Sequence, residues 1–398
     1  MKAGNDMNIV KICNEYCIGC GLCKSELGIE MQEAQKGYLS PILNKDEKTD
    51  EFLQAVCPVA DTHVNLEQNA DMWGKVLKAV GAHASDEVVR KQASSGGVLT
   101  ALAIYLLESG KVDGVIQVCA SKEKPTETIC RVSESKEQVL ECSGSRYAIS
   151  VPWLNLSEQI KEGMRYAAIG KPCDIVALRR LREFDDKYRN ILYLLSFFCA
   201  GLPSKDANKE LLKQLGCREE DCVSLSYRGN GWPGDATAVD KAGNEYRMEY
   251  GKAWGDILGR DVHPYCRLCI DGIGEAADIA CGDGWYIKDN QPDFSERDGR
   301  NIVFVRNEAG LKLMKDAVEA GVLVAEEWED LEQLQIIQKY QYVRKATMRA
   351  KVLGYHVCGR KTPKYDKSVL RAYSCNATKK EKLKIFLGTV KRILQGKI

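Results

Sequence analysis

Hydrophobic and polar positions in the middle of the chain follow the periods of helices and strands. Residues 94–109 place apolar side chains at helical spacing, and residues 112–119 form a short apolar run that is typical of a buried strand. The order then repeats, with a strand expected at 165–170, a helix at 174–182 and another buried strand at 191–198. This alternation predicts an α/β fold in which helices cover a sheet.

The two ends of the chain have a different texture. Residues 1–70 contain five cysteines and little periodicity, which predicts a small module held together by metal rather than by its own hydrophobic core. A helix at 311–320 is expected to close the α/β region. Residues 379–397 contain seven Lys and Arg against one Glu, with apolar side chains on one helical face. We expect a basic amphipathic helix on a solvated surface, with peripheral contact to a membrane or a partner as the alternative.

Composition narrows the class of protein. The 398 residues carry 57 Lys and Arg against 56 Asp and Glu, and a net charge of +1 offers no general field for nucleic acid. With 44% hydrophobic and 28% charged residues the chain is globular, which excludes a disordered or fibrous protein. The apolar runs are too short to span a bilayer, and the N-terminus lacks the pattern of a secretory signal. We therefore expect a cytoplasmic protein without a transmembrane segment, whose 17 cysteines stay reduced.

Three cysteines near the N-terminus have the spacing of an iron–sulfur motif. Cys17, Cys20 and Cys23 are each separated by two residues, which lets one loop supply three corners of a [4Fe–4S] cluster. Cys57, which precedes a proline, is the expected fourth ligand. A zinc site or a set of free thiols is the weaker alternative, because zinc sites prefer two separated cysteine pairs. Cys13 lies just outside the motif and is interpreted as a spare thiol.

Four further cysteines could meet at one site. Cys266 and Cys269 form a second C-x2-C pair, while Cys173 and Cys199 each follow an expected strand. Ligands of open α/β sheets bind at the carboxyl ends of strands, so these thiols could form a second four-cysteine cluster. Spacing alone leaves this open, because a buried cysteine is often a small hydrophobe and a lone C-x2-C also occurs in redox and zinc sites. The remaining cysteines are interpreted as structural: Cys119, Cys130, Cys142, Cys217, Cys222, Cys281, Cys358 and Cys375.

Glycine-rich turns suggest a ligand with a phosphorylated tail. Residues 92–97 precede a helix expected to begin near Val98, where serine hydroxyls and glycine backbone could face an anion, although a plain serine N-cap fits equally well. The turns at 143–147 and 227–234 combine donors, an arginine and an aromatic ring, which suits a planar heterocycle, but each alone is more often only a turn. The sequence lacks the dinucleotide fingerprint, the P-loop and the common hydrolase motifs. Electron transfer is therefore the best supported chemistry.

These motifs, in this order, resemble the beta subunit of coenzyme F420 hydrogenases and dehydrogenases, a family of iron–sulfur flavoproteins. The similarity covers most of the chain. It rests on CIGCGLC with the remote Cys57-Pro58 pair and on seven later segments: QASSGGVLTALAIYLLESGKVDGVI at 92–116, GSRY at 144–147, GKPCD at 170–174, FFCAG at 197–201, YRGNGWPG at 227–234, CRLC at 266–269 and ADIACGDGWY at 277–286. GKPC replaces a more common GTPC, and GSRY lacks the lysine that often precedes the tyrosine. These departures weaken inference about the substrate more than about the cofactors.

The resemblance implies one or two [4Fe–4S] clusters and a flavin, taken as FAD. It favours Cys173, Cys199, Cys266 and Cys269 as ligands of a second cluster, beside Cys17, Cys20, Cys23 and Cys57 for the first. It also implies a set of flavin contacts: Ser95, Gly96, Gly97, Gly144, Ser145, Arg146, Arg228, Gly282 and Asp283. The loop at 228–234 is expected to border the acceptor pocket, and no residue is assigned a catalytic role.

The implied fold is an N-terminal ferredoxin-like [4Fe–4S] module followed by a mixed α/β, or α+β, flavin-binding core. Four parts are expected along the chain. They are the module at 1–70, the N-terminal part of the beta-subunit region at 71–165, a flavin- and cluster-binding part at 166–345 and a basic extension at 346–398.

The implied function is that of an oxidoreductase. Electrons from ferredoxin, or from a redox partner subunit, would pass through the clusters and FAD to a small-molecule acceptor. Coenzyme F420 is one candidate for that acceptor, since members of the family occur in organisms with and without this deazaflavin. Two alternatives stay open on the sequence alone: a non-catalytic relay subunit of a larger complex, and a protein associated with polysaccharide biosynthesis whose clusters are structural staples.

Overall fold

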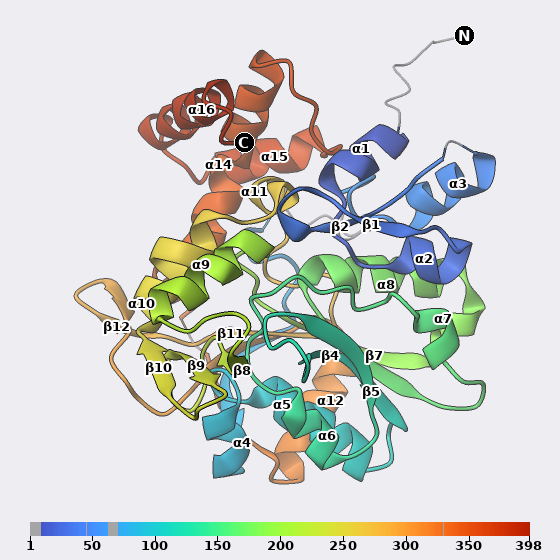
Figure 1. The fold of residues 1–398 in the computed structure, drawn as a ribbon, viewed down its shortest axis with the longest axis vertical. Helices are drawn as coiled ribbons and strands as arrows, with labels where there is room; N and C mark the ends of the chain where they lie inside the picture. The colour runs from blue at the N-terminus through green and yellow to red at the C-terminus, as the bar shows by residue number, and fades with distance from the viewer. Residues whose placement is uncertain (1–8, 45, 63–70, 329) are drawn as a thin grey trace.

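A mixed sheet of eight strands forms the centre of the protein (Figure 1). The computed structural model describes residues 9–44, 46–62, 71–328 and 330–398. Four adjacent strands, β11, β7, β6 and β4, run parallel to one another, and the remaining strands pair antiparallel. In order across the sheet the strands are β15 (Leu323–Glu327), β3 (Lys78–Ala84), β14 (Asn301–Val305), β11 (Ile279–Asp283), β7 (Ile191–Phe197), β6 (Tyr166–Gly170), β4 (Gly114–Ala120) and β5 (Thr128–Ser133).

Helices cover this sheet, and smaller sheets stand beside it. The helices are α1 (Ile9–Tyr16), α2 (Leu22–Leu27), α3 (Glu47–Val56), α4 (Glu87–Gln92), α5 (Val98–Glu108), α6 (Lys136–Glu141), α7 (Leu156–Gln159), α8 (Pro172–Phe184), α9 (Lys205–Leu215), α10 (Tyr250–Lys252), α11 (Pro264–Leu268), α12 (Glu308–Glu319), α13 (Leu334–Ile337), α14 (Lys339–Val357), α15 (Lys367–Ser374) and α16 (Lys379–Leu394). The strands of the smaller sheets are β1 (Met31–Glu33), β2 (Leu39–Pro41), β8 (Cys222–Ser226), β9 (Ala236–Asp240), β10 (Glu245–Met248), β12 (Tyr286–Lys288) and β13 (Gln291–Asp293).

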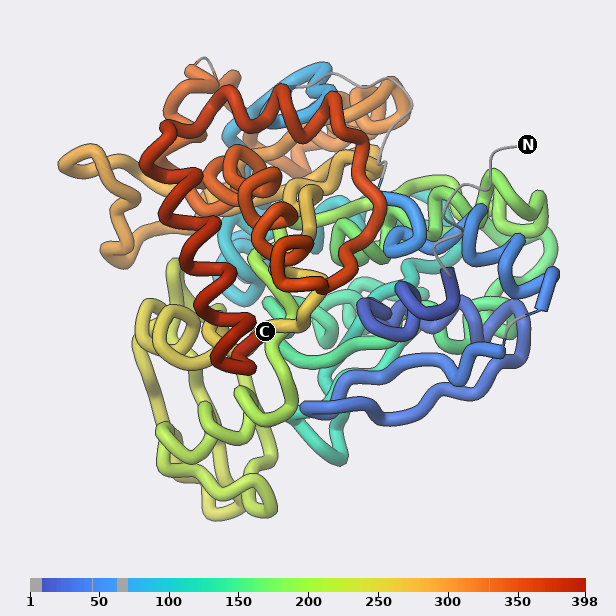
Figure 2. Tube along the Cα trace, turned by 90° about the horizontal axis from the view of Figure 1, so that it is seen from above, coloured from blue at the N-terminus to red at the C-terminus, as the bar shows by residue number. Residues whose placement is uncertain are grey.

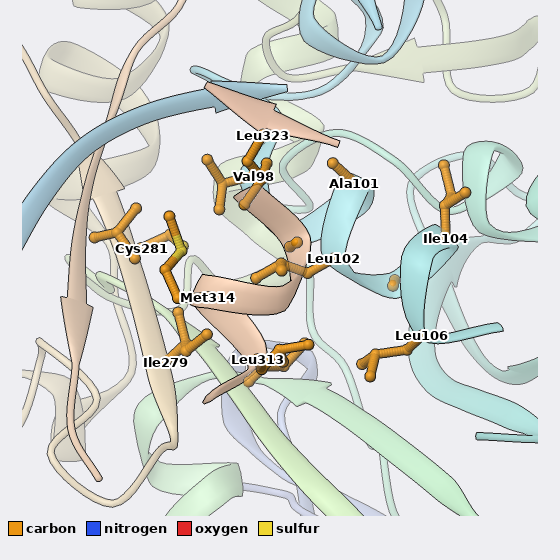
Figure 3. Packing of buried hydrophobic residues seen from close by; sticks show 14 of the residues in the cluster. Val98, Ala101, Leu102, Ile104, Leu106, Ile279, Cys281, Leu313, Met314 and Leu323 are labelled. Carbon is orange, nitrogen blue, oxygen red and sulfur yellow. The ribbon is translucent and has the colours of Figure 1, made fainter. Parts of the chain in front are cut away.

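Apolar side chains pack on both faces of the large sheet. On one face α5 and α12 bury Val98, Leu102 and Met314 against Ile279 and Cys281 of β11 (Figure 3). On the opposite face α8 packs against β6 and β7, together with side chains of α2 and α3 from the N-terminal part. Parallel strands need this double cover, because both of their faces are apolar.

The helices and strands expected from the hydrophobic pattern are confirmed. Their ends shift by a few residues, because periodicity does not mark the turn residues at which an element begins or ends. The expected strands at 112–119, 165–170 and 191–198 are β4, β6 and β7, and the expected helices at 94–109, 174–182, 311–320 and 379–397 are α5, α8, α12 and α16.

The N-terminal helices α1 to α3 share a hydrophobic core with the rest of the chain. Ile12 of α1 lies in one apolar cluster with Tyr265 and with Met348 of α14. Phe52 of α3 lies in the core that α8 forms with the sheet. Apolar side-chain packing therefore attaches this N-terminal part to the rest of the chain. Its likeness to a ferredoxin stays a prediction.

The C-terminal helices α14, α15 and α16 form a layer at one end of the molecule (Figure 1). α14 packs against the other two, and Gly354 allows the approach of α16, since a Cβ there would stand 3.1 Å from Thr389. Figure 2 shows the last helix, in red, on the outer side of this layer. α14 begins at Lys339, and the division of the chain at residue 346 stays a prediction. Among the described helices, none combines the length and apolar character needed to cross a membrane.

Candidate functional site

A cavity of about 880 Å³ lies at the carboxyl ends of the parallel strands. β6 ends at Gly170, β7 at Phe197 and β11 at Asp283, and all three residues line the cavity. In open α/β sheets this edge is where ligands bind. The volume falls in the upper part of the range for small-molecule sites, which is about 300–1,000 Å³. The cavity is therefore large enough for an extended ligand.

The walls of the cavity combine flat rings with hydroxyl groups. The aromatic residues that line it are Tyr147, Phe197, Phe198, Tyr250, Trp254, Trp285, Phe294 and Tyr340, and the serines are Ser94, Ser95, Ser143, Ser145 and Ser150. Trp285 stacks on the buried Trp232 with ring centres 4.4 Å apart, which fixes the plane of its ring. Aromatic surface together with hydrogen-bonding hydroxyls suits a planar ring system that carries a polar tail.

Eight of the nine predicted cofactor contacts line this cavity. They are Ser95, Gly97, Gly144, Ser145, Arg146, Arg228, Gly282 and Asp283. The ninth, Gly96, does not line it and packs against the chain, where a Cβ would come within 2.7 Å of the Ala82 carbonyl oxygen. Gly144 has φ +93° and nothing nearer than 3.9 Å on its Cβ side, so a ligand could approach its backbone. The fold brings these residues to one place, and their part in binding stays a prediction.

The start of α5 corrects one interpretation of the sequence. The N-cap residue is Gly97, with φ +72°, and its position has no side-chain cap. The side-chain oxygen of Asn301 accepts a hydrogen bond from the Val98 N–H at 3.3 Å. Ser95 donates to the Arg300 carbonyl oxygen at 2.7 Å, so its hydroxyl holds the neighbouring segment. A plain serine N-cap is therefore wrong for this turn.

Arg146 is held by backbone groups of its surroundings. Its guanidinium donates to the carbonyl oxygens of Leu225, Pro125 and Glu127 at 3.0, 2.6 and 3.1 Å. It also lies over the ring of Tyr227, 5.0 Å from the ring centre. These contacts fix the 144–147 loop at the cavity wall, and they leave little of the guanidinium for a ligand phosphate.

Arg228 and Asp283, both predicted flavin contacts, form an ion pair with each other. Two guanidinium N–H groups donate to the carboxylate at 2.9 Å each, and Arg228 is only 3% exposed. The guanidinium also lies over the rings of Tyr250 and Trp285. Burial alone would raise the pKa of Asp283, but the ion pair and the hydrogen bonds from Arg228 and Trp232 hold it below its ordinary value. The pair therefore anchors the aromatic wall of the cavity.

A second ion pair lies in the cavity wall beside Cys173. Lys171 Nζ is 2.6 Å from Asp174 Oδ2 and donates to Ser150 Oγ at 3.0 Å. Lys171 is 8% exposed and Asp174 is 1% exposed. Burial raises the pKa of Asp174, while the positive charge of Lys171 acts in the opposite direction. In the sequence Lys171 stood out only as a departure from the common GTPC motif, and nothing there assigned it to the site.

The four cysteines predicted for a second cluster come together from three segments. Cys173 lies in the first turn of α8, Cys199 follows β7, and Cys266 and Cys269 lie in and directly after α11. All four line one small gap in the interior, and we name them the inner thiol group. Burial raises the pKa of Cys266 to about 12, with a smaller contribution from repulsion by Cys199 and Cys269. Sequence spacing related only Cys266 to Cys269, and the fold brings Cys173 and Cys199 beside them.

Positive charge and N–H donors surround the inner thiol group. Lys171 and Arg344 line the same gap, and Arg344 is only 6% exposed. Arg344 donates to the Cys199 carbonyl oxygen at 3.3 Å, and the Leu202 N–H donates to Cys266 Sγ at 3.3 Å. Hydrogen bonds to sulfur and nearby cations stabilise a negatively charged iron–sulfur centre. No sequence motif indicated Arg344, which comes from α14, far along the chain.

Cys17 and Cys20 lie in the loop between α1 and α2, Cys23 lies in the first turn of α2, and Cys57 caps the end of α3. We name Cys17, Cys20, Cys23 and Cys57 the outer thiol group. Gly21 has φ +94°, and a Cβ at this position would stand 2.6 Å from the Leu154 backbone nitrogen. The Trp153 N–H donates to the Cys20 carbonyl oxygen at 2.9 Å. Close contact with the segment at 151–154 thus shapes the loop that carries Cys17 and Cys20 and leads into Cys23 of α2.

Cys13, interpreted from the sequence as a spare thiol, lies beside the outer thiol group. It is buried, and its Sγ donates a hydrogen bond to Cys57 Sγ at 3.7 Å. This hydrogen bond lowers the pKa of Cys57. Spacing could not signal the contact, because 44 residues separate the two positions. Five thiols therefore gather at the N-terminal site.

The outer thiol group, the inner thiol group and the cavity are neighbours in that order. Tyr265 packs in one apolar cluster with Cys57 of the outer group and Cys269 of the inner group. Cys199 and Lys171 line both the gap between the inner thiols and the large cavity. Redox groups held at these three places would lie one after another along a short path for electron transfer.

The cysteine donor sets fit an iron–sulfur cluster. Across the described ranges, no three His, Cys, Asp or Glu side chains are close enough to bind one ion together. A zinc ion would need its ligands within about 2.0–2.3 Å of one point. A four-iron cluster holds its thiolates farther apart, because irons and sulfides fill the space between them. All-cysteine donor sets of four are also the usual ligands of [4Fe–4S], so the residues fit that group.

Grouped thiols beside a large cavity, on a mixed α/β sheet, are typical of redox proteins. Two models of one family match the chain. The family is described as the beta subunit of coenzyme F420 hydrogenase/dehydrogenase. Residues 79–158 match the model of its N-terminal part, and residues 163–331 match the model of its C-terminal part. Together the two matches cover more than half of the chain, which belongs to this family. The resemblance seen in the sequence is confirmed, and membership makes the chain an oxidoreductase with a role in electron transfer.

Relatives of known activity are similar over most of this chain. The coenzyme F420 hydrogenase subunit beta of Methanococcus voltae is 26% identical over 305 residues, which are 73% of this chain and 99% of the relative. The F420-dependent formate dehydrogenase 1 subunit beta of Methanococcus maripaludis is 26% identical over 239 residues, 60% of this chain and 58% of the relative. The coenzyme F420-dependent sulfite reductase of Methanocaldococcus jannaschii is 29% identical over 264 residues, which are 62% of this chain but 38% of that protein.

A solved structure has the same fold. It is a chain in a xenon derivative of the F420-reducing [NiFe] hydrogenase complex from Methanosarcina barkeri. The TM-score is 0.58 at 22% identity, and the similarity covers 76% of this chain and 100% of that chain. The mixed α/β fold class expected from the sequence is thereby confirmed.

Proposed function

We propose that the chain is an iron–sulfur flavoprotein that passes electrons between a ferredoxin-type one-electron carrier and an organic two-electron acceptor. The observation that carries this proposal is the position of Cys199. This residue lines the large cavity and also the gap between the inner thiols. A redox group on those thiols would stand beside a ligand in the cavity, and such proximity is what transfer between two bound groups requires.

Two [4Fe–4S] clusters are the groups proposed for the thiols. The outer thiol group would hold the first, within the proposed module at 1–70, and the inner thiol group the second. When bound, such clusters supply single-electron transfer. Lys171 and Arg344 place positive charge at the inner group, and the Leu202 N–H bonds to Cys266 Sγ. These three groups stabilise added negative charge and so favour reduction at this position.

FAD is the group proposed for the large cavity. When bound, a flavin supplies the exchange between single electrons and a hydride. Trp285 and Trp254 offer flat surfaces for its ring system. The hydroxyls of Ser94 and Ser145 lie 2.7 Å apart and face the cavity, and the backbone of Gly144 is open to a ligand. These groups would bind and orient the flavin, while the Arg228 pair keeps the aromatic wall in position.

Coenzyme F420 is the first acceptor to test. The similar hydrogenase, formate dehydrogenase and sulfite reductase all carry F420 in their names. The loop at 228–234, expected to border the acceptor pocket, contributes Arg228 and Pro233 to the cavity wall. A planar acceptor could therefore stack beside the flavin in the same cavity.

A redox partner subunit belongs to the same proposal. The solved chain of similar fold is part of a hydrogenase complex. A relay subunit without turnover of its own would use both thiol groups but would have no use for a cavity of about 880 Å³. Clusters acting only as staples would not need the shared wall between the inner thiols and the cavity. A catalytic role is therefore preferred over both alternatives.

Stopped-flow reduction of the bound flavin by ferredoxin tests the proposal. Anaerobically purified wild type should reduce its flavin rapidly and then reduce F420. Cys199→Ala should keep its flavin but accept electrons from ferredoxin far more slowly. Cys375→Ala, at an exposed cysteine, is the matched control and should behave as wild type. Flavin reduction at the wild-type rate in Cys199→Ala would contradict the proposed path.

A further inference from the structure

We propose that the C-terminal helices bind the surface of an anionic membrane, with α16 lying in the lipid–water interface. Membrane attachment goes beyond the electron-transfer role and does not depend on it. The charge of the helical layer, the exposed apolar side chains of α16 and the packing of that helix each point to this surface.

The chain is strongly divided in charge. Residues 339–398 contain 17 Lys and Arg but only two Asp and Glu, which gives this part a net charge of +15. Because the whole chain has +1, residues 1–338 carry a net charge of −14. Twelve of the 17 basic side chains are exposed. The overall balance thus conceals a basic layer that anionic lipids would attract.

α16 has one broad apolar face, and only part of it packs against protein. Thr389 and Ile393 are buried on the side that faces α14. On the outward side Leu383, Leu387 and Leu394 are 57%, 54% and 78% exposed. Spacings of four and seven residues place these leucines on one stripe. A helix whose outward side meets only water has no need of these exposed leucines.

Lysines border the stripe of leucines. Lys380, Lys384 and Lys391 are exposed and lie beside it on the helix surface. Leu353 and Val357, one turn apart on the neighbouring α14, are also 55% and 64% exposed. Apolar side chains framed by lysines are the pattern of helices that lie in the membrane interface, where the leucines reach the acyl boundary and the ammonium groups reach the lipid phosphates.

A flat surface can reach α16, because this helix lies on the outer side of the layer (Figure 2). An acidic protein would match the lysines but would also need an apolar groove shaped for leucines that stand outward over three turns of helix. A bilayer interface accepts both groups without such a match. An anionic membrane is therefore the partner that the charge and the leucines favour together.

Vesicle sedimentation of the cofactor-loaded full chain tests the proposal. The wild type should bind vesicles of equal parts phosphatidylglycerol and phosphatidylcholine, and it should bind pure phosphatidylcholine far less. Leu383→Gln with Leu387→Gln should lower the partition coefficient at least about tenfold. Replacing three lysines by glutamine should lower it by about fivefold for each lysine. Leu331→Gln, at a leucine that is 45% exposed outside the layer, is the matched control and should bind as wild type.

Three results would overturn the proposal. They are the absence of binding to anionic vesicles, wild-type binding by the leucine variant, and equal binding to neutral and anionic vesicles. A dimer in sedimentation that the leucine variant abolishes, without vesicle binding, would assign the face to a second copy of the chain. Because the leucines are exposed, the variants should keep the circular dichroism and iron content of the wild type, which excludes misfolding as the cause.

Discussion

Replacement of Arg228 by methionine should destabilise the fold more than it weakens cofactor binding. Arg228 gives two hydrogen bonds of 2.9 Å to Asp283 and is 3% exposed. Methionine keeps much of the side-chain volume but removes the positive charge. Asp283 is then left as a largely buried carboxylate without its cation, which is the costly way to break a buried ion pair.

The magnitude follows from what remains around Asp283. Removing one partner of a buried pair costs about 3–5 kcal/mol. Trp232 Nε1 still donates to Asp283 at 2.9 Å, and 20% of the Asp283 side chain is exposed, so the loss should lie at the lower end. We therefore expect the free energy of unfolding to fall by about 3 kcal/mol. Adding Asp283→Asn should recover part of this loss, because the unpaired charge is then gone.

The effect should depend on pH in a definite direction. The pKa of Asp283 in the wild type lies below its ordinary value, so the ion pair stabilises the fold fully above pH about 4 and less as pH falls through the lowered pKa. In Arg228→Met the guanidinium no longer offsets the effect of burial, so the pKa of Asp283 should rise. Acid should then protonate the unpaired carboxylate and remove its buried charge. The difference in stability between the two proteins should therefore narrow on acidification.

Urea unfolding followed by circular dichroism, at neutral and at mildly acidic pH, measures both effects. Flavin content of the same preparations shows whether binding is affected separately. A loss below about 1 kcal/mol at neutral pH, or a difference that widens in acid, would refute this interpretation of the pair. Unchanged stability with loss of flavin would instead make Arg228 a direct ligand contact.

Two further substitutions test the packing of the cavity and the outer thiols. Gly282→Ala should lower stability by about 1–3 kcal/mol, because the added Cβ would overlap the Phe198 ring, and thermal unfolding would measure this. An unchanged melting temperature would mean that the ring can move aside. Cys57→Ala should remove about half of the bound iron, while Cys13→Ala should keep it. Iron content per chain measures both effects. Iron loss in Cys13→Ala would make Cys13 a cluster ligand.

Local sequence patterns predicted the elements of the fold but not how its edges pair. α5 and α8 could be expected because their apolar residues recur at helical spacing over several turns. The pairing of β3 with β14 joins Ala82 to Asn301, and no local pattern marks a contact over such a distance in the chain. The antiparallel edge of the sheet is therefore a result of tertiary packing.

The same limit applies to the candidate site. Cys17, Cys20 and Cys23 could be grouped because two residues separate each from the next. The inner thiol group comes from three separate segments, so spacing could raise it only as a question. Arg344 and the contact of Cys13 with Cys57 had no local signal, because each depends on helices that meet only in the folded chain.

Cofactor content per chain tests the central claim most directly. Protein purified without oxygen should contain about eight irons, as many sulfides and one FAD, since two four-iron clusters and one flavin are proposed. Its visible spectrum should bleach with dithionite at both the flavin and the cluster bands. About four irons with FAD would remove the inner cluster from the account, and iron without any flavin would contradict the assignment as a flavoprotein oxidoreductase.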